Sequence, residues 1–298
     1  MTKLGFLFNL SRGFIYFYHS MEISLAAETL FHLGPVEVTN SLFSAFLIVF
    51  IIGVAAVVIG RKLSVESPSK LQLILEMILG SFRATSNDIL GKLRTRSLFS
   101  FLFTFFIFII FSNWFGLLPF VGPIVIEHHS GPEEVIEIET HDEGVSVLGC
   151  IKDRDCVLTT SGIKKIEAYP VFRAPTSDVS ATLALALIAM AGIHYVGVTS
   201  LGRGYFKKYF NFSNPIDAFV GILELLSEAG KIVSFTFRLF GNIFAGEVLL
   251  IVITSISFGL ATLPFLALEV FVGFIQAFVF FMLIVIFLSV AVVPHEHN

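Results

Sequence analysis

The residues of this chain best suited to chemistry are charged side chains inside two long apolar stretches near its C-terminal end. Arg238 lies in a run that stays apolar for several helical turns beyond it, Glu247 follows nine residues later, and Glu269 lies in the last apolar stretch. An Arg at the centre of a membrane helix costs roughly 2.5–3.5 kcal/mol on insertion scales, so such residues usually face a partner or a water-filled cavity. Carboxyl groups at that depth suit proton relay, whereas a guanidinium group keeps its charge.

Helical spacing divides the polar side chains of this region into two sets. At about 100° per residue, one face of a helix over 215–258 carries Glu224, Lys231, Ser234, Arg238 and Asn242. Glu247 lies about 180° from Arg238 on the same helix, so we expect the two to face different partners. On the last helix Glu269 and Gln276 are seven residues apart and share a face, which can meet Glu247 across a hairpin. Gly241, Ala245 and Gly246 are expected to give a smooth surface beside Arg238, where another helix can approach.

These two sets indicate a device for moving protons. One set carries a permanent cation, which would ionise a facing carboxyl group and repel cations that try to pass straight through. The other set carries groups able to gain and lose a proton. The sequence contains no nucleotide-binding loop, nucleophile triad or metal motif, so we expect a non-catalytic subunit that needs no cofactor.

Composition indicates that a membrane protein carries these residues. Of the 298 residues, 55% are hydrophobic and 14% are charged, and the mean hydropathy is +0.88, whereas soluble domains have about 25% charged residues. The expected all-α fold is a single membrane domain, with a helical stripe within 61–97 read as an amphipathic surface helix. The last two helices are longer than a perpendicular crossing needs, which predicts a strongly tilted hairpin. The expected membrane helices span 41–60, 98–121, 179–200, 215–258 and 262–293.

The charges of the loops predict the orientation. Residues 61–97 hold seven Lys or Arg against three acids, and 201–210 hold three basic residues and no acid, whereas 122–177 hold five basic and ten acidic residues. By the positive-inside rule the first two segments are cytoplasmic and the acidic loop is outside. We therefore expect the N-terminus outside and the C-terminus in the cytoplasm. The true start is Met1 or Met21.

The acidic loop offers two further hypotheses. Three histidines, His128, His129 and His141, lie among its acids and could bind a metal. A solvated acidic segment is favoured over a metal site. A β-hairpin over 145–160 is expected, with strands at 145–148 and 157–160. Cys150 and Cys156 would then face each other as a disulfide, if the loop is outside the cell, or remain free thiols. Either state points to loop stabilisation.

The segment Arg238-Leu-Phe-Gly-Asn-Ile-Phe-Ala-Gly-Glu247 resembles the signature of subunit a of the F-type ATP synthase membrane sector. Supporting likenesses cover most of the chain: 26–34 with 39–41, Asn113-Trp-Phe-Gly-Leu-Leu-Pro119, Arg173-Ala-Pro-Thr-Ser-Asp178 with 182–187, and Gln276-Ala-Phe-Val-Phe. The family often has a His at one of the positions of Glu247 and Glu269, whereas this chain has Glu at both, and two close carboxyl groups titrate as a coupled pair.

The resemblance implies a proton-translocating stator subunit in a bacterial inner membrane. Its partners would be the lipid bilayer, a ring of c subunits, the peripheral-stalk b subunits and other ATP synthase subunits, with no nucleic acid. Arg238 would face the essential carboxylate of the ring, and two half-channels would couple proton flow to rotation and ATP synthesis. The outer half-channel would be lined by Asn242, Glu247, Glu269 and Gln276, the cytoplasmic exit by Glu224, Lys231 and Ser234, and the outer entrance by Arg173, Asp178 and Asn113.

Two other functions compete with this interpretation. A secondary transporter could bind an anionic solute at Arg238 midway through the membrane, although such folds often show inverted repeats and broken helices, and neither is found in this sequence. A purely structural membrane subunit would use its charges only to fix helix packing, and it would tolerate conservative exchange of them.

Overall fold

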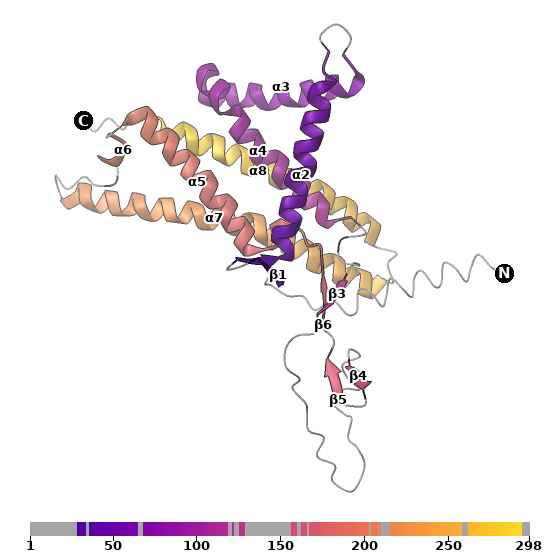
Figure 1. Cartoon of the computed structure of the whole chain (residues 1–298). Coiled ribbons are helices and arrows are strands. Elements are labelled where there is room, and N and C mark those ends of the chain that lie inside the picture. The colour runs from indigo at the N-terminus through magenta and orange to yellow at the C-terminus, as the bar shows by residue number, and fades with distance from the viewer. Residues whose placement is uncertain are drawn as a thin grey trace.

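The computed structural model of the chain (Figure 1) describes residues 29–33, 36–64, 68–118, 121, 125–128, 156–159, 162–165, 167–202, 204–207, 209, 215–257 and 262–293. Helices dominate these segments. They are α2 (Asn40–Arg61), α3 (Lys70–Leu90), α4 (Lys92–Gly116), α5 (Val179–Leu201), the short α6 (Gly204–Lys207), α7 (Pro215–Ser257) and α8 (Thr262–Ala291), with a 3-10 turn η1 (Pro175–Ser177) before α5.

Five of these helices, α2, α4, α5, α7 and α8, are long and apolar enough to cross a membrane. The predicted all-α, polytopic membrane fold is therefore confirmed. The helix α7 has 43 residues. At 1.5 Å per residue it is about 65 Å long, roughly twice the hydrocarbon thickness of a bilayer. Figure 1 shows α7 and α8 crossing the direction of α2 steeply, as the tilted hairpin requires.

The centre of the bundle is α8, which packs against α4, α5 and α7. Phe280, Phe281 and Ile284 on α8 are fully buried, and they belong to one apolar cluster with side chains from α3, α4, α5 and α7. Phe82 of α3 joins this cluster, with its ring centroid 4.9 Å from that of Phe281. This packing fixes α8, and therefore Glu269 and Gln276, relative to α4 and α7.

The helices α3 and α4 meet at a corner that shifts the predicted second span. Gly91 has φ of 80° and separates α3 from α4, so α4 begins at Lys92 and not at residue 98. Its first turns therefore carry the basic residues that were assigned to the surface segment. At the other end α4 stops at Gly116, because residues 117–118 turn away, and not at 121.

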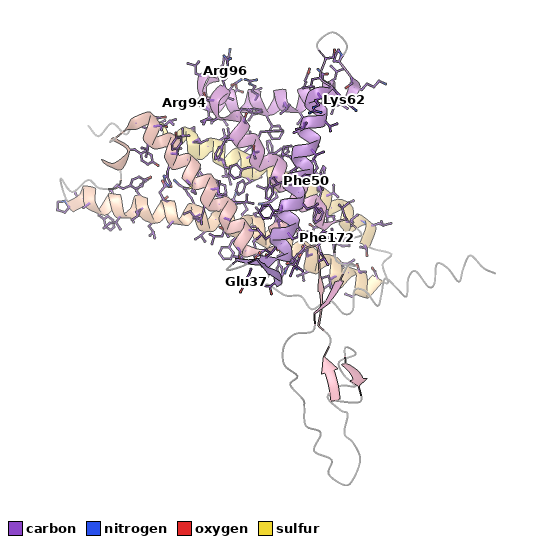
Figure 2. All side chains as sticks on the ribbon, in the orientation of Figure 1. Glu37, Phe50, Lys62, Arg94, Arg96 and Phe172 are labelled. Atoms are coloured by element: carbon purple, nitrogen blue, oxygen red, sulfur yellow. The ribbon has the colours of Figure 1, made fainter. Side chains whose placement is uncertain are left out.

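The helix α3 lies across the ends of α2 and α4 (Figure 1). It exposes Leu73, Ile74 and Met77 on one side and buries Phe82 in the core, which suits a helix at a membrane surface. Ser69 caps its N-terminus by accepting a hydrogen bond from the backbone N–H of Gln72 at 3.2 Å. Figure 2 shows Lys62, Arg94 and Arg96 at this end of the molecule, and Glu37 at the opposite end.

The strands form three antiparallel pairs outside the bundle. β1 (Thr29–Leu33) pairs with β2 (Val36–Thr39), β3 (Val125–His128) with β6 (Glu167–Pro170), and β4 (Cys156–Thr159) with β5 (Gly162–Lys165). The described partner of β4 is thus the strand after it. The partner expected from the sequence, residues 145–148, lies outside the described residues, as do Cys150, His129 and His141.

The corner at Gly91 predicts a stability difference between two glycines. Gly91→Ala forces a side chain into a backbone conformation that almost only glycine adopts, which costs about 1–3 kcal/mol. Gly80→Ala lies within α3 with open space around it, so it gains roughly 0.5–1 kcal/mol of helix propensity. Thermal unfolding of the purified protein in detergent should rank the midpoints Gly80→Ala above wild type above Gly91→Ala. A Gly91→Ala midpoint at or above wild type would contradict the described corner.

Candidate functional site

Arg238 lies on the outer side of α7, away from the packed core. It is exposed, and one guanidinium nitrogen donates a hydrogen bond to the Ser234 hydroxyl at 3.2 Å, one turn earlier. Its neighbours Val233 and Phe237 are 55% and 58% exposed. Among the residues that the structure describes, no acid forms an ion pair with Arg238. Within the described part of the chain, the flank of α7 beside the guanidinium is therefore uncovered.

Glu247 faces the opposite way, into the protein. Its carboxyl group interacts with the Arg173 guanidinium, with the Ser177 hydroxyl and with Glu269 of α8. Glu269 is itself 8% exposed. The hairpin of α7 and α8 thus brings the two acids into one neighbourhood.

Gly246 makes room for this pair. A Cβ atom at Gly246 would overlap the carboxyl group of Glu269. The sequence-based expectation for Gly246 was therefore wrong: it lies against Glu269 inside the hairpin and not on the smooth surface beside Arg238. On that outer surface Gly241 has open space around it and Ala245 is exposed.

Among the described residues, two amide side chains of the hairpin lack hydrogen-bond partners for their nitrogens. The amide nitrogens of Asn242 on α7 and Gln276 on α8 are buried and have no hydrogen-bond partner within the described part of the chain. An unpaired buried amide costs about 1–3 kcal/mol. Such groups are normally satisfied by water or by a partner.

The turn before α5 also contributes residues to this region. The Arg173 backbone N–H donates to the Ser44 hydroxyl of α2 at 3.2 Å, and its side-chain Nε donates to the Ser177 hydroxyl at 3.1 Å. Asp178 is buried and caps α5, accepting a hydrogen bond from the Ser180 N–H at 3.0 Å. These bonds hold the Arg173 side chain against the turn, where its charge acts on Glu247, whereas the side chain of Asp178 serves the helix start.

Asn113 joins three elements beside the acids. Its amide nitrogen donates to the Gly273 carbonyl of α8 at 3.1 Å, and its amide oxygen accepts from the Thr176 hydroxyl of η1 at 2.8 Å. The neighbouring Trp114 donates to the Val270 carbonyl at 3.1 Å. These bonds attach the end of α4 to α8, one helical turn from Glu269 and Gln276.

A second polar cluster lies at the other end of the bundle, and sequence reasoning found only one of its members. Lys231 forms an ion pair with Glu228 at 2.8 Å. Glu228 also accepts a hydrogen bond from Tyr209 at 3.1 Å, and Tyr209 and His194 both contact the Tyr205 hydroxyl. Glu224, which was grouped with Lys231, is half-buried one turn earlier. The sequence could have indicated Glu228 through its three-residue spacing from Lys231, which places the two side chains next to each other on a helix surface.

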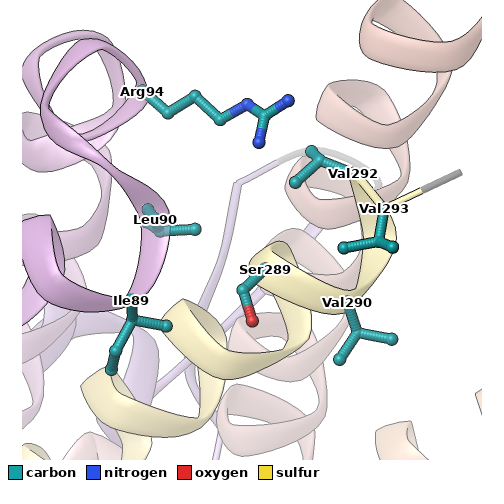
Figure 3. A pocket seen from close by; sticks show the side chains of 7 residues that line it. All are labelled: Ile89, Leu90, Arg94, Ser289, Val290, Val292 and Val293. Carbon is teal, nitrogen blue, oxygen red and sulfur yellow. The ribbon is translucent and has the colours of Figure 1, made fainter.

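A cavity of about 270 Å³ lies between the α3–α4 corner and the end of α8. Figure 3 shows Arg94 reaching over it toward Val292 and Val293. Its other lining residues are Ile89, Leu90, Ser289 and Val290. It holds none of the polar residues described above, so it is not part of the site.

A model of a known protein family matches most of this chain. The family model described as ATP synthase A chain matches residues 41–289. This chain belongs to the ATP synthase A chain family. The match contains Arg238, Glu247, Glu269 and Gln276.

Individual relatives match most of the chain. The ATP synthase subunit a of Gloeobacter violaceus is 27% identical over 276 residues, which is 93% of this chain and 93% of the relative. ATP synthase subunit a 2 of a Bradyrhizobium species is 28% identical over 90% of this chain and 95% of its own length. ATP synthase subunit a of Desulforamulus reducens is 30% identical over 77% of this chain and 70% of its own length.

Asn113 yields a prediction about the rigidity of the site. Asn113→Ala removes both hydrogen bonds and leaves the Thr176 hydroxyl buried without this acceptor, which costs about 1–3 kcal/mol. Thr176→Val should cost less, and the double variant should cost less than the sum because the two side chains share one bond. Thermal unfolding in detergent measures these changes, with Trp114→Phe as the control for a more exposed bond. Strict additivity would contradict the described contact.

Proposed function

We propose that this chain is the proton-translocating stator subunit of an F-type ATP synthase in a bacterial inner membrane. In this role it provides two half-channels and couples proton flow past a ring of c subunits to rotation and ATP synthesis. The ring, the peripheral-stalk b subunits and the remaining ATP synthase subunits are its proposed partners. Membership in the ATP synthase A chain family supports the assignment.

The observation that carries the proposal is the open position of Arg238. A guanidinium group stays charged at every physiological pH, and at membrane depth it needs a compensating partner. The described part of this chain supplies a hydroxyl and no acid. A carboxylate on a neighbouring rotor would supply the missing negative charge. The pairing would also stop a direct proton leak, because a fixed cation between the half-channels repels protons.

The inward-facing set supports an outer half-channel. Glu247 and Glu269 are carboxyl groups able to exchange protons, and Asn242 and Gln276 offer amide groups that water can satisfy. Phe172, the residue before Arg173, lies toward the side of the bundle that carries Glu37, away from Lys62, Arg94 and Arg96 (Figure 2). The Arg173 backbone is hydrogen-bonded to Ser44 in the first turns of α2. With the basic end in the cytoplasm, this set opens to the outside. The N-terminus then lies outside and the C-terminus in the cytoplasm.

Replacing Arg238 tests the proposal most simply. Arg238→Gln should abolish ATP-driven proton pumping by inverted membrane vesicles, because no fixed cation would then displace the proton of the ring carboxylate. Arg61→Gln, at the exposed end of α2, removes the same charge elsewhere and should pump normally. Pumping at the wild-type rate by an assembled Arg238→Gln complex would refute the proposed function. It would also leave the solute-transporter alternative to be tested by uptake of anionic solutes.

Replacing the two acids tests the outer path. Glu247→Gln and Glu269→Gln should each slow proton flux, and the double variant should slow it further, by roughly 10²-fold or more. The expected loss is one of rate and not of assembly, since glutamine keeps the size of the side chain. Glu37→Gln, an exposed acid on β2, is the matched control. Wild-type pumping by the double variant would exclude these acids from the path.

A further inference from the structure

The cluster around Glu228 links a buried carboxylate to the protein surface. The side chain of Glu228 is 10% exposed, whereas that of His194 is 36% exposed. Nε2 of His194 lies 4.0 Å from Oε2 of Glu228. The other ring nitrogen, Nδ1, lies 2.6 Å from the Tyr205 hydroxyl. The imidazole, a side chain able to accept and donate a proton, thus stands between a buried acid and solvent.

The structure holds this cluster in one geometry. The ring of Tyr205 lies directly against Gly197 of α5, where any side chain would collide with it. Tyr209 donates a hydrogen bond to Glu228, and burial together with the bond to Tyr205 raises the pKa of Tyr209. The Tyr209 hydroxyl therefore remains protonated and keeps donating. Tyr205 and Tyr209 are positioning residues, which connect α5 and α6 to the acid on α7.

The cluster also adjoins the face of α7 that carries Arg238. Lys231 pairs with Glu228 and lies seven residues before Arg238, or about 10 Å along the helix axis and on nearly the same face. On its other side the Lys231 ammonium group lies 5.1 Å from the centre of the Phe287 ring of α8. The charged or titratable groups that face Glu228 are thus Lys231, His194, Tyr205 and Tyr209 among the described residues.

We propose that Glu228 and His194 are successive proton-transfer groups at the cytoplasmic end of the path, an inference that rests on the proposed function. A proton arriving from the Arg238 side binds the Glu228 carboxylate. The O–H bond of the acid then breaks as an N–H bond forms at Nε2 of His194, which restores the carboxylate and gives an imidazolium. The imidazolium releases a proton to cytoplasmic water. In ATP-driven pumping the same steps run in reverse.

The distances set one requirement for this transfer. A separation of 4.0 Å exceeds hydrogen-bond length, so the proton crosses by a small side-chain rotation or through one water molecule. The ion pair with Lys231 keeps Glu228 from being an uncompensated charge in the bundle. A purely structural latch between α5, α6 and α7 would use the same contacts but would not depend on the chemistry of the imidazole.

Imidazole rescue separates these roles. Inverted membrane vesicles carrying the assembled complex are energised with ATP, and charge translocation is followed with a membrane-potential dye, because imidazole would collapse a pH gradient. His194→Ala should lower the rate about tenfold or more, in line with the contribution of a positioned acid or base. Added imidazole should restore the rate in His194→Ala and not in Glu228→Gln. Tyr195→Ala, a neighbouring exposed side chain on α5, is the matched control.

The alternative results each have a meaning. A wild-type rate in His194→Ala, or a loss that imidazole does not restore, overturns the proposal and leaves a structural latch. Rates are normalised to assembled complex by immunoblot. If His194→Ala does not assemble, His194→Gln replaces it, and this variant must flatten the pH dependence on the cytoplasmic side for the proposal to stand. Arg238→Gln in the same vesicles keeps the two claims apart, since intact pumping there refutes the proposed function, whereas intact pumping only in His194→Ala refutes this exit route.

Discussion

A permanent positive charge on the outer face of a long apolar helix is the constraint on which the whole arrangement depends. The free-energy cost of placing Arg238 at membrane depth is offset only if an anion meets it there. Ser234 orients the guanidinium by a single hydrogen bond, and Gly241 and Ala245 leave the adjoining surface free of bulk. The strong tilt of α7 and α8 gives this surface its length, since a helix of 43 residues cannot fit upright in a bilayer. Under the proposed function, the open flank and the tilt would together give a rotor ring a long surface to contact.

The inner face of the same hairpin holds the carboxyl groups of Glu247 and Glu269 near each other inside the protein. Gly246 provides the space for Glu269, while Arg173 and Ser177 approach Glu247 from the turn before α5. Asn113 ties this turn to α8. The rigid aromatic and aliphatic core around Phe280 and Phe281 holds α8 in place. Polar side chains and the packed core therefore lie side by side on α8, an apolar helix that carries Glu269 and Gln276 on one face.

The membrane class, the long helices and the tilted hairpin could be predicted from the sequence because apolar length and helical period are local signals. The division of α7 into two faces was predictable for the same reason. The position of Gly246 was not, because whether a small residue meets solvent or a neighbouring side chain depends on the rotation of both helices. Gly91 gave no signal that distinguishes a corner from an ordinary helical glycine. The spacing of Glu228 from Lys231 could have indicated their pairing, whereas the approach of His194 to Glu228 is a contact between α5 and α7 that no spacing within one helix reveals.

The most direct test of the central claim is a cryo-electron microscopy structure of the intact complex in a lipid nanodisc, at a resolution that shows side chains. The account predicts that the Arg238 guanidinium faces the rotor at the level of a ring carboxylate, with no acid of its own chain beside it. It also predicts density for water beside Asn242 and Gln276. A structure in which Arg238 points into lipid, or forms an ion pair with an acid of this chain while the rotor lies against another helix, would contradict it.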